Sequence, residues 1–124
     1  MSPEPFSKLA ERFPRQASVW AALSGWARSH RDVQFLDASR LGKLLKRKLR
    51  CGPEDATQIV SQIFDSGIFS VMFAIRSPRG SVFGPWQSIE DVPDQIEDAF
   101  GYFDAEDGDV VPVLVEVTAD AQPA

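Results

Sequence analysis

The sequence predicts a single α+β domain over residues 1–124. Apolar residues recur at helical spacing in three successive stretches between residues 18 and 66. Apolar residues then alternate with others from 69 to 76, and a second apolar run covers 110–117, as is typical of strands. With 124 residues and 44% hydrophobic content, the chain is long enough to bury a core.

Two helices are predicted at the start of the chain. The first covers residues 5–13 and ends before Pro14, because proline disfavours helical geometry in the residue that precedes it. The second runs from Ser18, as its N-cap, to about His30. Its apolar stripe is formed by Val19, Leu23, Trp26 and Ala27.

A brief strand over residues 32–36 precedes a third helix over 38–50, which we expect Asp37 to cap. Leucines form its buried side: Leu41, Leu44, Leu45 and Leu49. Cations lie on the opposite side within an arc of about 80°: Arg40, Lys43, Arg47 and Arg50. Lys48 falls among the leucines, so either the helix frays there or Lys48 bends outward.

A fourth helix is predicted over residues 53–66. We expect Gly52 to adopt the left-handed conformation that ends the third helix, and Pro53 suits the first position of the next. The apolar side consists of Ala56, Ile59, Val60, Ile63 and Phe64. The exposed side contains no cation and consists of Glu54, Asp55, Thr57, Gln58, Ser61, Gln62 and Asp65.

A β-hairpin is predicted after the fourth helix. Its first strand covers residues 69–76, residues 77–80 have turn chemistry, and residues 82–84 return. The alternating apolar positions of the first strand are Phe69, Val71, Phe73 and Ile75.

The pattern weakens downstream of the hairpin. Residues 93–100 are predicted to form one or two helical turns, and residues 104–109 a polar loop. A further strand covers 110–117, where Pro112 indicates a sheet edge or a strand start. Residues 118–124 are predicted to be a disordered tail.

The net charge of −5 conceals two oppositely charged parts. Residues 1–79 contain all 13 Lys and Arg beside seven acids, whereas residues 80–124 contain eleven acids and no Lys or Arg. Such a split indicates a basic part that faces a polyanion, or an acidic tail. The alternative is that the acidic part is a solvated surface that keeps the protein soluble.

The order of elements over residues 18–83 resembles that of a winged-helix domain. The stretches that carry the resemblance are LDASRLGKLLKRKL, PEDATQIVSQIFDSGIF and FSVMFAIRSPRGSVFG. The resemblance implies a three-helix core and a β-hairpin wing that carries Arg76 and Arg79. It also implies that the third helix of this core, residues 53–66, enters the DNA major groove. We expect the acidic residues 84–117 to form a β-containing C-terminal extension outside the minimal domain.

The exposed side of residues 53–66 departs from the DNA-binding pattern. Gln58 or Gln62 can read an adenine edge, but three carboxylates on this side oppose a polyanion. The candidate binding residues therefore lie mainly on the preceding helix, with two on the wing: Arg40, Lys43, Lys46, Arg47, Arg50, Arg76 and Arg79. Three interpretations remain open for the basic helix: a solvated face, contact with a DNA backbone, or contact with an acidic protein or the chain's own acidic region.

The sequence offers little material for catalysis or metal binding. His30 is the only histidine, and Cys51 is the only cysteine, which excludes an internal disulfide and a cysteine-built zinc site. The acidic run over 104–109 does not have EF-hand spacing. We therefore expect no enzyme activity, no catalytic residue, no cofactor and no metal.

The leading hypothesis is a non-enzymatic interaction module that binds another protein within a multi-protein assembly. The alternative is a DNA-binding transcriptional regulator that uses helix 38–50 and the wing. An exposed sheet edge would also permit a homodimer. No apolar run reaches the ~18 residues of a membrane span, and the first residues lack an apolar leader. We therefore predict a cytoplasmic location and no membrane partner.

Overall fold

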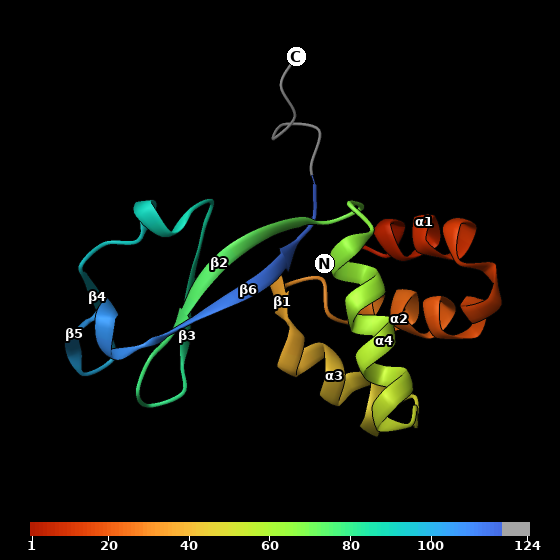
Figure 1. The fold of residues 1–124 in the computed structure, drawn as a ribbon, viewed down its shortest axis with the longest axis horizontal. Coiled ribbons are helices and arrows are strands. Elements are labelled where there is room, and N and C mark those ends of the chain that lie inside the picture. Colours follow the sequence, from red (N-terminus) through yellow and green to blue (C-terminus); the bar gives the residue numbers. More distant parts are fainter. Residues whose placement is uncertain (118–124) are drawn as a thin grey trace, which may run out of the picture. The chain divides into compact units, whose positions relative to one another are not determined.

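A computed structural model describes residues 1–117, and its helices and strands are labelled in Figure 1. The described chain divides into two compact units: unit 1 comprises residues 1–70 and 114–117, and unit 2 comprises residues 71–113. The mixture of helices and antiparallel strand pairs confirms the α+β class. The single-domain boundaries stay a prediction, and the predicted tail over 118–124 lies outside the described residues.

Unit 1 contains the four α-helices of the described chain: α1 (Glu4–Arg12), α2 (Ala17–Ser29), α3 (Ala38–Arg47) and α4 (Pro53–Asp65). A 3₁₀ helix over Pro14–Gln16 runs directly into α2. Because the chain is already helical before α2 begins, Ser18 lies inside the helix, and the predicted N-cap at Ser18 is wrong.

Helix α3 begins as predicted and ends earlier than predicted. The Asp37 carboxylate accepts a hydrogen bond of 3.2 Å from the Arg40 amide, which confirms the predicted cap. The helix ends at Arg47, and Arg50 has the left-handed conformation, with φ of 54°. Gly52 is extended, with φ of −64°, so its predicted left-handed conformation is wrong.

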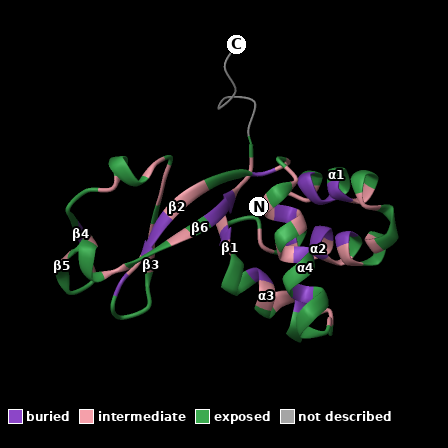
Figure 2. Cartoon of the chain, viewed as in Figure 1, coloured by how far each residue is buried: buried purple, intermediate pink, exposed green. Residues whose placement is uncertain are grey.

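The helices of unit 1 share one apolar core. Leu41 and Leu45 of α3 lie in the same buried cluster as Ile59 and Ile63 of α4. Figure 2 shows buried positions on all four helices. Helix α1 contributes to this cluster through Phe6, so the core includes residues N-terminal to position 18, where the predicted winged-helix-like core begins.

The described strands are β1 (Phe35–Asp37), β2 (Ser70–Arg76), β3 (Val82–Trp86), β4 (Gln95–Asp98), β5 (Gly101–Asp104) and β6 (Asp109–Val115). The main sheet has the order β1-β6-β2-β3, and β4 and β5 form a second sheet. Strands β2 and β3 are antiparallel, with Ile75 opposite Phe83, which confirms the predicted hairpin. Its turn contains Gly80 with φ of 93°.

Two predictions for the C-terminal part are wrong. Residues 93–100 contain β4 instead of helical turns, because Ile96 is buried and pairs with Phe103 of β5. Pro112 lies within β6, an interior strand of the main sheet, and not at an edge or a strand start.

Candidate binding surfaces

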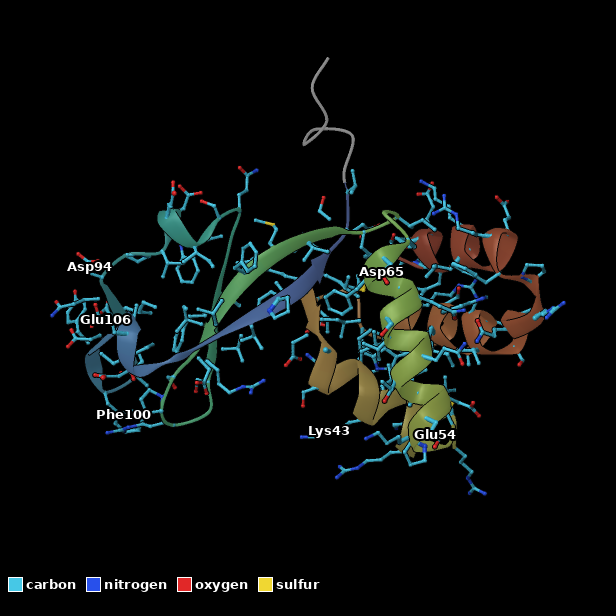
Figure 3. The ribbon with its side chains drawn as sticks, viewed as in Figure 1. Lys43, Glu54, Asp65, Asp94, Phe100 and Glu106 are labelled. Atoms are coloured by element: carbon cyan, nitrogen blue, oxygen red, sulfur yellow. The ribbon has the colours of Figure 1, made fainter. Side chains whose placement is uncertain are left out.

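Four cations of α3 form one exposed surface, which we call the basic face: Arg40, Lys43, Lys46 and Arg47. The side chain of Lys43 projects away from the helices in Figure 3. At ~100° per residue, the four positions fall within an arc of about 120°. Leu41 and Leu45 on the other side are fully buried and fix the rotation of the helix, so the cations face solvent.

An aromatic side chain from α2 lies beside the basic face. The Cζ atom of Arg40 is 5.8 Å from the ring centroid of Trp26, a cation–π distance. Trp26 also stacks on His30, with ring centroids 4.6 Å apart. A shallow pocket of about 200 Å³ here is lined by Trp26, Leu44, three cations of the basic face (Arg40, Lys43 and Arg47) and Lys48. The sequence predicted that Trp26 lies on the apolar stripe of its own helix. It did not predict the contact with Arg40, because that contact depends on how α2 and α3 pack together.

The structure does not group all seven predicted cations. Arg50 lies beyond the end of α3, so its predicted place on the helical stripe is wrong. Arg76 and Arg79 belong to unit 2, Arg76 at the end of β2 and Arg79 in the following turn. The Arg79 guanidinium lies 3.8 Å from the ring centroid of Phe100. The structure therefore joins four of the seven residues into one surface.

Helix α4 exposes carboxylates and small polar groups. Its exposed polar side chains are Glu54, Asp55, Thr57, Gln58, Ser61 and Asp65. Gln62, a predicted adenine reader, is half-buried, and its Oε1 atom is buried without a hydrogen-bond partner. A groove of about 390 Å³ separates this polar side of α4 from Lys43 and Lys46 of α3.

Within residues 1–117, no group of three or more His, Cys, Asp or Glu side chains is arranged to hold a metal ion. In the same part of the chain, the helices are too short or too polar to cross a membrane. Comparison with protein-family models, with curated proteins and with solved structures finds no match.

Proposed function

We propose that the chain is a non-enzymatic, winged-helix-like interaction module whose basic face binds an acidic segment of a partner protein. The observation that carries this proposal is the exposure of four cations on one capped helix, beside a tryptophan that is itself fixed by stacking. A fixed cation loses less conformational entropy when it binds than a free one. Arg40, the cation that contacts Trp26, is therefore better prepared for a specific partner than a cation on a merely solvated helix.

The strand order supports the winged-helix part of the proposal. A winged-helix domain places the short strand between its first two helices beside the ribbon that follows its third helix. Here β1 lies between α2 and α3, and it neighbours β6, which in turn neighbours β2. In this proposal β2 and β6 form the ribbon, and residues 77–108 form an enlarged wing.

The charge of α4 favours a protein over DNA as the partner. In a winged-helix DNA-binding protein this helix would enter the major groove. Glu54, Asp55 and Asp65 are exposed on it, and each would repel phosphate. The basic face itself favours a second candidate function, a DNA-binding regulator that grips the phosphate backbone through α3.

The test compares two fluorescein-labelled probes by anisotropy: an Asp- and Glu-rich peptide and a DNA duplex. The variant R40E/R47E should weaken binding of the acidic peptide by at least about tenfold, because two attractive contacts become repulsive. The matched variant K8E/R28E changes two exposed cations of α1 and α2 by the same total charge. It should retain most of the affinity.

The outcomes separate the two candidate functions. The DNA-binding regulator would be established instead if the chain binds the duplex more tightly than the peptide. The affinity for the duplex should then fall steeply as salt is added, and R40E/R47E should abolish binding. If R40E/R47E and K8E/R28E lower the affinity for the acidic peptide equally, binding depends only on the net charge of the chain, which would contradict a specific basic face. Failure to bind either probe at low salt would contradict both functions.

A further inference from the structure

Unit 2 contains an apolar groove of about 470 Å³ that the proposed function does not use. Its lining includes Ile75, Ile89, Val92 and Val110. Ile75 is buried, whereas Ile89 is 57% exposed and Val110 is 48% exposed. Large aliphatic side chains that gather around one exposed hollow are typical of a surface that is covered by a binding partner.

Three carboxylates border this groove: Asp94, Asp104 and Glu106. Asp94 and Asp104 are ten positions apart in the sequence, and the backbone holds them together because the Ala105 amide donates a hydrogen bond of 2.8 Å to the Asp94 carbonyl. All three side chains are exposed, and Figure 3 shows Asp94 and Glu106 projecting from unit 2. Unit 2 contains two cations, Arg76 and Arg79, whereas residues 80–117 contain ten acids and no Lys or Arg.

We propose that this groove binds a cationic segment of another protein, one in which Lys or Arg residues alternate with aliphatic side chains. The carboxylates would pair with the cations, and Ile89 and Val110 would bury the aliphatic groups. A cation alone would leave both aliphatic side chains exposed, and an acidic segment would be repelled. The inference rests on the proposed function only in treating the chain as an interaction module, because the groove and the basic face share no residue.

The test uses three fluorescein-labelled peptides: alternating Lys and Leu, alternating Lys and Ser, and alternating Glu and Leu. The Lys-Leu peptide should bind at least about fivefold more tightly than the Lys-Ser peptide, because only Leu covers the apolar lining. The Glu-Leu peptide should not bind. The variant I89S should weaken binding of the Lys-Leu peptide severalfold and leave the affinity for the Lys-Ser peptide unchanged. Because Ile89 is 57% exposed, this substitution should preserve the fold.

A charge-reversal pair tests the carboxylates. D94K/E106K should lower the affinity for the Lys-Leu peptide by at least about tenfold, whereas E11K/D65K should lower it by less than about twofold. The control changes the net charge equally at two exposed positions of unit 1. The proposal is overturned if the two variants lower the affinity for the Lys-Leu peptide equally, or if the Lys-Leu and Lys-Ser peptides bind equally tightly. Binding would then be a nonspecific electrostatic attraction.

Two further measurements separate this site from the basic face and from self-association. R40E/R47E should retain the wild-type affinity for the Lys-Leu peptide, so failure of the groove and failure of the basic face are distinguishable. Sedimentation velocity should show no association of the chain with itself. Self-association that both D94K/E106K and R40E/R47E abolish would assign the groove to a second copy and overturn the proposal.

Discussion

The guanidinium of Arg40 lies over the indole ring of Trp26, with its Cζ atom 5.8 Å from the ring centroid. The contact joins the basic face of α3 to α2, the helix that carries Trp26. A cation–π pair at a partly exposed position contributes about 0.5–1 kcal/mol. Arg40 is therefore the cation of the basic face whose position is fixed by an aromatic neighbour.

A double-mutant cycle measures this contact. The variants R40A, W26L and R40A/W26L should show a coupling of about 0.5 kcal/mol in the free energy of unfolding, determined by urea denaturation. The pair R28A and W26L is the control, because residues two apart on a helix do not face each other. A coupling for Arg40 no larger than that for Arg28 would contradict the contact.

The cap of α3 gives a second prediction. D37A removes the carboxylate that accepts from the Arg40 amide and should lower the free energy of unfolding by at least about 1 kcal/mol. The comparison is D32A, which removes an exposed carboxylate from the turn before β1. D32A should change stability by less than about 0.5 kcal/mol. Similar unfolding midpoints for the two variants would exclude a capping role for Asp37.

The residue after α3 gives a third prediction. Arg50 has φ of 54°, a region that costs a residue with a Cβ atom about 1 kcal/mol relative to glycine. R50G should therefore raise the melting temperature by about 3 °C, and R50V should lower it. Differential scanning calorimetry gives both values. Destabilisation by R50G would mean that the chain does not take this conformation at position 50.

Two glycines give opposite predictions for substitution by alanine. A Cβ atom at Gly108 would lie 2.6 Å from Cγ2 of Ile75 and 2.7 Å from the carbonyl oxygen of Arg76. G108A should therefore destabilise the protein by about 2 kcal/mol. A Cβ atom at Gly42, inside α3, would meet nothing within 4 Å, so G42A should stabilise it by about 1 kcal/mol. Urea denaturation decides both signs, and a tolerated G108A would contradict the packing against Ile75.

Local patterns predicted the elements whose stability is local or strongly periodic. Helix α4 matches the prediction over 53–66 closely because Pro53 starts it and its apolar residues recur with helical period. Strand β4 was missed because it is held by cross-strand pairing with β5, and only Ile96 of its four residues is apolar. The interior place of β6 was also missed, because strand order depends on contacts far apart in the sequence.

For the candidate sites too, local sequence patterns predicted what lies on one helix but not what several elements form together. The charge pattern of α3 identified four residues of the basic face, but helical spacing alone extended the stripe to Arg50, which lies beyond the helix end. The groove of unit 2 was not predicted, because its lining comes from the strands β2, β5 and β6, from two 3₁₀ helices over Ile89–Asp91 and Ala105–Asp107, and from residues 92–94. The available signals were the lack of cations after Arg79 and the position of the aliphatic residues Ile89 and Val110 next to acids.

The most direct test of the basic face as a binding surface is a ¹H–¹⁵N NMR titration of the whole chain with the Asp- and Glu-rich peptide. We predict that the largest shift changes occur at the backbone amides of residues 40–47 and at the indole N–H of Trp26. R40E/R47E should abolish these changes. Largest changes along the exposed side of α4, or within residues 71–113, would contradict the account.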